Sequence, residues 1–114
     1  MRVLVVGAGR VASKVLLQLK KNSSITVVTV DPRARPPAVE EGIIMDVDYR
    51  SELKLGELSD LIRNENPDIV LVTTSAEDIS RTGVSGLDIL VEALRSELEA
   101  SANVPIIAVS RDVS

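Results

Sequence analysis

The fold of this chain is decided by the stretch Val3-Leu4-Val5-Val6-Gly7-Ala8-Gly9-Arg10-Val11-Ala12. Four aliphatic residues lead into the pattern Gly-x-Gly-x-x-Ala, and a helical pattern follows at once. In such a strand–turn–helix, Gly7 permits the tight turn, Gly9 lets a pyrophosphate approach the backbone, and Ala12 lets the helix pack close to the strand. The stretch therefore predicts the start of a dinucleotide-binding βαβ unit, with the phosphates at the amino end of the helix.

The residues that follow have the spacing that this unit requires. Residues 10–21 carry apolar side chains at helical intervals, and residues 25–30 form an apolar strand that runs into Asp31. Asp31 lies about 20 residues beyond the glycines, where a carboxylate is expected to bind the ribose hydroxyls of the nucleotide. The alternative is a structural turn in a related fold that binds no nucleotide.

Composition narrows the classes of function. The chain has 114 residues, 45% of them hydrophobic, with a net charge of −4, no Cys, no His and one aromatic residue, Tyr49. These values predict one globular domain and argue against nucleic-acid binding, disulfides, a Cys/His metal site and imidazole chemistry. Its apolar runs are too short to enter a membrane and no signal-peptide pattern is present, so we expect a cytoplasmic location. Tyr49 is followed four residues later by Leu53, not by the lysine of a short-chain reductase, and no catalysis is predicted for this chain alone.

Strand and helix patterns alternate along the rest of the chain. We expect at most one helical turn at 38–41, a third strand at 43–45, a helix at 53–66, a fourth strand at 68–73, a long helix at 84–98 and a fifth strand at 106–109. This alternation predicts an α/β, doubly wound parallel sheet of Rossmann-like type, with five strands in the order 3-2-1-4-5. Residues 1–114 are expected to form this single domain, either as a compact version of the fold or as a piece of a longer chain.

The predicted nucleotide-binding residues follow the carboxyl ends of the first four strands. They are Gly7, Ala8, Gly9, Arg10 and Val11 in the turn, Asp31 and Arg33 after the second strand, Asp46 and Val47 after the third, and Thr73, Thr74 and Ser75 after the fourth.

Asp31 is the most discriminating of these residues, because it can accept from both ribose hydroxyls and would repel a 2′-phosphate. It therefore favours NAD, NADH or an adenine nucleotide (ATP, ADP or AMP) over NADP. Arg33 and Arg35 could instead accommodate a phosphate or stack on adenine. The alternatives are a turn-forming Asp31 before Pro32 and two arginines in a solvated loop.

The remaining site residues each have a second interpretation. Arg10 could clamp the pyrophosphate or lie on the surface. Asp46 could accept from the adenine amine while Val47 covers the ring, or Asp46 could start a turn. Thr73, Thr74 and Ser75 could reach the phosphate or the second ribose, and helix capping accounts for them equally well.

The chain resembles the N-terminal nucleotide-binding domain of the regulator of potassium conductance family (RCK, or TrkA-type). The resemblance rests on residues 5–12, on Asp31, on the segment 43–48 and on the segment 67–75. It departs from the family where Met45 replaces a turn glycine and where a proline-rich loop replaces the second helix. The resemblance implies a regulatory domain that binds NAD(H) and transmits its occupancy to a partner or an attached domain.

Two other functions stay open at this point. One is the cofactor-binding half of an NAD-dependent oxidoreductase, and the other is an interaction module that has lost its ligand. Because the outer strands of the sheet would present open edges, we also expect a homodimer or an attached domain that covers them.

Overall fold

The structure is a computed structural model that describes residues 1–51, 55–73 and 104–109. In chain order its elements are β1 (Arg2–Val6), α1 (Arg10–Leu19), β2 (Thr26–Asp31), α2 (Pro37–Glu40), β3 (Tyr49–Arg50), α3 (Leu55–Glu65), β4 (Ile69–Val72) and β5 (Ile106–Ala108). The strands form one sheet in the order β3-β2-β1-β4-β5, and every neighbouring pair is parallel. The α/β class, the five-stranded Rossmann-like sheet and the strand order are therefore confirmed.

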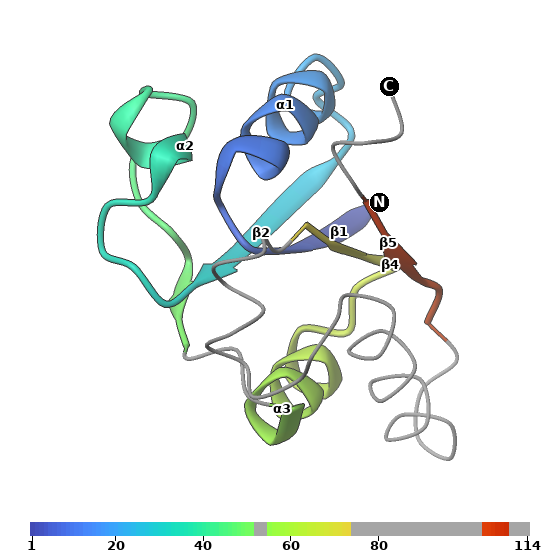
Figure 1. Ribbon diagram of the computed structural model, residues 1–114. Helices are drawn as coiled ribbons and strands as arrows, with labels where there is room; N and C mark the ends of the chain where they lie inside the picture. The colour runs from blue at the N-terminus through green and yellow to red at the C-terminus, as the bar shows by residue number, and fades with distance from the viewer. Residues whose placement is uncertain (52–54, 74–103, 110–114) are drawn as a thin grey trace.

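Helices cover both faces of this sheet (Figure 1): α1 and α2 lie on one face and α3 on the other. The central strand β1 is apolar on both sides, as a parallel strand between two helical layers must be. Its Val3 and Val5 belong to the cluster that contains α1 and α2, whereas Leu4 and Val6 belong to the cluster that contains α3. The two-residue alternation of the strand thus divides one apolar run between two cores.

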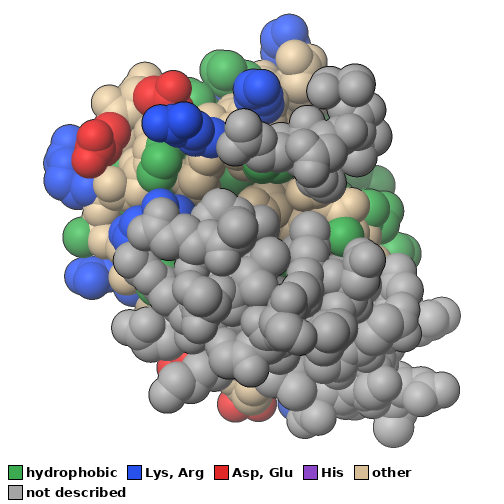
Figure 2. Space-filling model, viewed as in Figure 1, with side chains coloured by type: hydrophobic (Ala, Val, Ile, Leu, Met, Phe, Trp, Pro, Cys, Tyr) green, Lys and Arg blue, Asp and Glu red, His purple; other side chains and the backbone are tan. Residues whose placement is uncertain are grey.

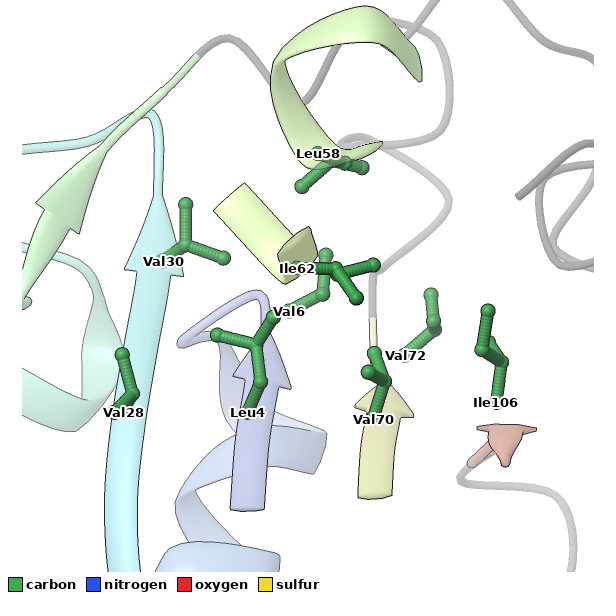
Figure 3. Packing of buried hydrophobic residues seen from close by; sticks show 9 residues of the cluster. All are labelled: Leu4, Val6, Val28, Val30, Leu58, Ile62, Val70, Val72 and Ile106. Carbon is green, nitrogen blue, oxygen red and sulfur yellow. The ribbon is translucent and has the colours of Figure 1, made fainter. Parts of the chain in front are cut away.

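On the α3 face, Leu58 and Ile62 are four residues apart and pack down onto the sheet (Figure 3). The cluster around them consists of Leu4, Val6, Val28, Val30, Val70, Val72 and Ile106. On the opposite face the buried residues of α1 include Ala12 and Leu16, and Ala8 of the preceding turn belongs to the same cluster. The small side chain of Ala12 allows close approach between helix and strand. Both cores are aliphatic, in keeping with a chain that has no Phe or Trp.

Most expected elements are present with ends shifted by one or two residues, a normal uncertainty for helix and strand termini. The helix expected at 10–21 ends at Leu19, and the strand expected at 25–30 is β2, which includes Asp31. The single helical turn expected at 38–41 is α2, which has Pro37 as its first residue, a position that suits proline. The long helix expected at 84–98 lies outside the described residues.

The third strand was predicted at the wrong place. Residues 43–45 are irregular, and β3 is formed by Tyr49 and Arg50 instead. Gly42 adopts a left-handed φ of 75° after α2, and the main-chain N–H groups of Ile43 and Ile44 both donate to the carbonyl of Ala38. The segment is thereby folded back against α2, and the side chains of Ile43 and Ile44 pack on the α1 face of the sheet without pairing as a strand. Met45 is exposed. Asp46 and Val47 consequently precede β3 and do not follow it.

Within the described residues, no helix combines the length and the apolar character needed to cross a bilayer.

Candidate nucleotide-binding site

The turn after β1 has the backbone geometry that its glycines predict. Gly7 has a φ of 96°, a left-handed conformation that costs other residues about 1–2 kcal/mol. Its N–H group donates to the carbonyl of Val30 at 2.7 Å, which ties the start of the turn to β2. Gly9 has a φ of −80°, so its backbone conformation does not require a glycine.

Helix α1 begins in this turn with Gly9 as its N-cap residue. Gly9 has no side chain with which to cap the helix. Its carbonyl accepts two hydrogen bonds at 2.9 Å, from the N–H group and from the hydroxyl of Ser13. Within the described part of the chain, no acceptor pairs with the N–H groups of Arg10, Val11 or Ala12. The amino end of α1 therefore offers main-chain donors and a partial positive charge to an anion.

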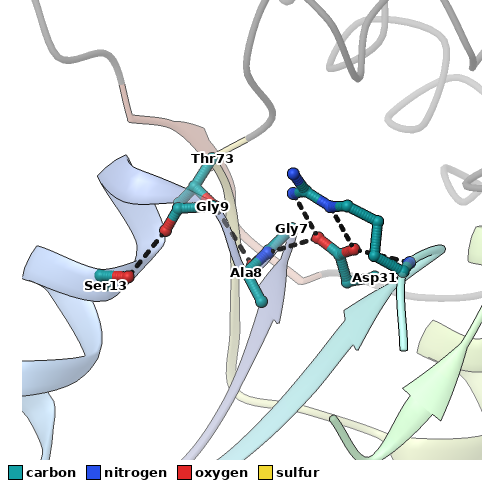
Figure 4. A network of polar contacts seen from close by, with 7 residues as sticks. Gly7, Ala8, Gly9, Ser13, Asp31 and Thr73 are labelled. Atoms are coloured by element: carbon teal, nitrogen blue, oxygen red, sulfur yellow. Dashed lines mark hydrogen bonds and ion pairs between the residues drawn. The ribbon is translucent and has the colours of Figure 1, made fainter. Parts of the chain in front are cut away.

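Asp31 closes the site at the carboxyl end of β2 (Figure 4). Its carboxylate has no exposed surface and accepts four hydrogen bonds. Oδ2 accepts from the N–H group of Ala8 at 2.8 Å and from Arg33 Nη2 at 3.0 Å. Oδ1 accepts from the N–H group of Arg33 at 2.8 Å and from its Nε at 3.0 Å. Asp31, which was expected to bind the ribose, thus accepts hydrogen bonds from the glycine turn at Ala8 and from the neighbouring Arg33.

The Arg33 guanidinium lies over the same turn. Its side chain is 25% exposed and binds the carboxylate of Asp31 through two nitrogens. A Cβ atom built on Gly9 would lie 3.4 Å from Arg33 Nη2, so this nitrogen covers the surface where Gly9 leaves the backbone bare. Of the predicted site residues, the structure brings together Gly7, Ala8, Gly9, Asp31 and Arg33.

Thr73 lies at the end of β4 with its hydroxyl turned to the first strand. Its hydroxyl donates to the carbonyl of Val6 at 2.8 Å, and its N–H group donates to the same carbonyl at 2.9 Å. The side chain is 2% exposed, so its observed contact supports the strand that carries the turn. The predicted neighbours Thr74 and Ser75 lie outside the described residues.

Asp46 and Val47 lie in the irregular segment between α2 and β3. Val47 is buried in the α1-side core, and Asp46 is exposed with its Oδ1 accepting the N–H group of Val47 at 2.9 Å. Asp46 lines a cavity of about 390 Å³ that is also bordered by Lys20, the C-cap residue of α1, and by Ile25. The adenine contacts predicted for these two residues stay a prediction.

Arg10 and Val11 occupy the first turn of α1, one exposed and one half-buried. Arg10 borders a cavity of about 450 Å³ between α1 and α2, together with Lys14 and Glu40. Basic and acidic side chains accordingly lie close together on the visible face over these two helices (Figure 2). Two contacts of the site were not anticipated from the sequence, the hydroxyl of Ser13 on Gly9 and the pairing of Arg33 with Asp31. The spacing of four residues within a helix could have indicated the first.

The strand order, the glycine turn and the amino end of α1 together define a Rossmann-like fold. Neither a scan against protein-family models nor a search of curated proteins gives a match for this chain. Solved structures do match. One is glycinamide-RNase-transformylase T from Mycobacterium tuberculosis, with a TM-score of 0.63 and 23% identity over 95% of this chain and 28% of that chain.

Two further similar structures were solved with a dinucleotide. A short-chain dehydrogenase/reductase from Veillonella parvula in complex with NADP has a TM-score of 0.53 and 19% identity, covering 94% of this chain and 46% of that chain. UDP-glucuronic acid 4-epimerase from Bacillus cereus in complex with NAD has a TM-score of 0.57 and 21% identity, covering 95% of this chain and 39% of that chain. This chain therefore spans less than half of each of these proteins, and the similarity establishes the fold.

Proposed function

We propose that this chain is a nucleotide-binding regulatory domain of the RCK/TrkA type, which binds NAD(H) or an adenine nucleotide at the Gly7–Ala12 turn without catalysing a reaction. The observation that carries the proposal is that Gly9, which has no side chain, lies next to N–H groups at the start of α1 that no side chain caps. A pyrophosphate or phosphate requires both close approach to the main chain and donors aimed at it. The NAD and NADP complexes of similar folds support the same class of ligand.

The side chains of the chain favour regulation over catalysis. It has no His and no Cys, and its single tyrosine donates a hydrogen bond to Glu65 Oε2 at 2.9 Å. A hydride-transfer enzyme needs a positioned acid or base in addition to its cofactor. The second candidate function is therefore the cofactor-binding half of an oxidoreductase, with the substrate domain supplied elsewhere. The similarity to a dehydrogenase/reductase and an epimerase favours that candidate.

A regulatory domain must transmit its ligand occupancy to a second protein or domain, and we propose a homodimer or a partner domain for this role. The β5 strand is the last strand of the described sheet, and its Ile107 is 44% exposed. An apolar side chain on a sheet edge is a suitable contact for another chain. The cytoplasmic location expected from the sequence stays a prediction.

Replacing Gly9 with alanine tests the ligand site without testing the fold. Alanine accepts the φ of −80°, and its methyl group would meet only the flexible end of Arg33, at 3.4 Å. We expect NAD, NADH, NADP, ATP, ADP or AMP to stabilise the wild-type chain by about 2.7 kcal/mol when the ligand is present at about 100 times its dissociation constant. Gly9→Ala should lose this stabilisation, because the methyl group lies where the phosphate must approach.

Gly56→Ala is the matched control. A Cβ on this glycine of α3 meets nothing within 4 Å, so ligand stabilisation should be preserved. Equal ligand stabilisation of Gly9→Ala and the wild type would place the ligand elsewhere. Oxidation of NADH by the wild-type chain with a simple carbonyl substrate would favour the oxidoreductase candidate over the regulatory one.

A further inference from the structure

The groove between α1 and α2 has walls of opposite charge. The two helices lie side by side on one face of the sheet (Figure 1), and both line the cavity of about 450 Å³ between them. Arg10 and Lys14 line it from α1, whereas Glu40 and Glu41 line it from the end of α2. The α1 wall is therefore basic and the α2 wall acidic.

These four charges have no counterparts within the described chain. All four residues are exposed, and within residues 1–51, 55–73 and 104–109 none of them takes part in a salt bridge or a side-chain hydrogen bond. The opposite charges of the two walls thus do not pair with one another. They are suited to a partner that carries the complementary arrangement of charge.

The same groove also presents apolar side chains. Leu17, which follows Lys14 by three residues on the same face of α1, is 50% exposed, and Ile43 lines the groove as well. Leu17 belongs to neither core cluster of the sheet. Apolar contacts surrounded by charged residues are the usual composition of a protein–protein interface.

A second copy of this chain carries the complementary arrangement. When two copies meet face to face about a two-fold axis that runs along the groove, the rotation places the α1 wall of one copy opposite the α2 wall of the other. Basic residues then meet acidic residues in both halves of the interface, and each Leu17 is covered by the other copy. A two-fold axis that runs across the groove would instead bring walls of like charge together.

We propose that the groove between α1 and α2 is the interface of a two-fold symmetric homodimer, in which Arg10 and Lys14 of one copy pair with Glu40 and Glu41 of the other. The inference rests on the proposed function for its regulatory role and names the partner that this role requires. None of the groove residues belongs to β5, so this interface differs from a contact at the β5 edge. Because Arg10 is the first residue of α1, the interface adjoins the glycine turn.

Sedimentation equilibrium of the wild-type chain tests whether the dimer forms. We expect a dissociation constant below about 1 mM at low ionic strength. The dimer should weaken in about 1 M salt, because exposed ion pairs are screened over about 3 Å under that condition.

Charge reversal tests which surface is used. Lys14→Glu places like charges opposite one another in both halves of the interface and should raise the dissociation constant at least about 10-fold. Glu40→Lys should do the same from the other wall. Lys21→Glu is the matched control, because it makes the same change of charge on an exposed residue outside the groove, and it should keep the wild-type dissociation constant.

Mixing the two variants distinguishes a contact between copies from one within a copy. In a heterodimer of Lys14→Glu with Glu40→Lys, the introduced glutamate faces the introduced lysine in one half of the interface. In the other half, the unchanged Lys14 faces the unchanged Glu40. The mixture should therefore associate at least about 10-fold more tightly than either variant alone.

The outcomes separate this inference from the proposed function. A wild-type chain that stays monomeric up to about 1 mM would overturn the inference and leave the nucleotide site in place. A dimer that Lys14→Glu weakens no more than Lys21→Glu, or variants that do not associate when mixed, would also overturn it. Failure of every nucleotide to stabilise the wild-type chain would overturn the proposed function and leave the dimer interface in place.

Discussion

Asp31, the last residue of β2, and Asp48, which lies beside this strand, both accept hydrogen bonds from main-chain N–H groups. Their surroundings differ. Asp31 is buried at the carboxyl end of the strand, and Arg33 neutralises it. Asp48 is exposed at the outer edge of the strand, and its Oδ2 accepts from the N–H group of Thr29 at 2.8 Å and from the Thr29 hydroxyl at 3.1 Å. One carboxylate is paired with a cation out of water, and the other binds neutral donors in contact with water.

The difference follows from the pairing of β2. Its inner edge pairs with β1 over five residues, from Arg2↔Thr26 to Val6↔Val30. Its outer edge pairs with β3 at Val30 and Asp31 only. Where the ladder on the outer edge is missing, a side chain supplies the acceptor that a neighbouring strand would otherwise provide. The two carboxylates are therefore expected to contribute to stability to different extents.

The largest effect is expected for Asp31→Ala. This change removes the buried carboxylate that accepts from the Arg33 guanidinium and from the N–H group of Ala8. Removing one partner of such a pair costs about 3–5 kcal/mol, measurable as the free energy of unfolding in urea.

Asp46→Ala is the control for this comparison, because Asp46 is exposed and accepts only from the adjacent residue. Its expected cost is within about 0.5 kcal/mol. If Asp31→Ala costs no more than Asp46→Ala, burial of the ion pair contributes nothing to stability.

A smaller effect is expected for Asp48→Ala. Its hydrogen bonds to Thr29 are part-buried and involve neutral donors, so we expect a loss of about 0.5–1.5 kcal/mol. The Thr29 amide should also exchange its hydrogen faster. Asp48→Asn retains an acceptor oxygen and should recover most of the loss. A loss for Asp48→Ala as large as that for Asp31→Ala would remove the distinction between the two sites.

The smallest effect on stability is expected for Tyr49, the first residue of β3. The hydrogen bond that the phenol donates to Glu65 raises the pKa of Tyr49 above its ordinary value, and partial burial and the negative charges of Glu65 and Asp48 act in the same direction. The fold therefore favours the protonated phenol. The stability from this contact is present below the unfolded-state pKa of about 10 and is lost as the pH rises through the higher folded-state pKa.

Because Tyr49 is the only aromatic residue, its ultraviolet absorbance can be titrated without interference. Glu65→Gln should lower the pKa of Tyr49, whereas Asp60→Asn, on an exposed residue of the same helix, should leave it unchanged. An unchanged Tyr49 pKa in Glu65→Gln would show that the contact with Glu65 does not hold the proton.

The sequence predicts the sheet well because its signal is repeated. The central strand is apolar on both faces, the helix after it has regular spacing, and the glycine turn joins them. The segment 43–45 carries only the local part of this signal. Two isoleucines can pack against a sheet or pair within it, and their composition is the same in both cases. What decides between them is the carbonyl of Ala38, which accepts both N–H groups.

The position of the candidate site could be predicted from the sequence, but the hydrogen-bond partners of Asp31 could not. Asp31 lies where the spacing from the glycines places it. Its acceptors, however, are taken by a side chain only two residues further along, which returns to it after Pro32. Such a return depends on the path of the loop, which charge patterns in a sequence do not encode. The ribose contact of Asp31 stays a prediction, and the ion pair with Arg33 is what the sequence did not indicate.

The central place of β1 also affects the order in which the chain matures during synthesis. Residues 1–31 contain β1, α1 and β2, so one edge of β1 and the glycine turn can form as soon as this short segment leaves the ribosome. The other edge waits for β4, and the Thr73 hydroxyl that holds the carbonyl of Val6 is separated from it by 67 positions. A nascent chain halted before Thr73 therefore carries the glycine turn on a strand with one open edge. This edge is covered only after β4 has paired with β1.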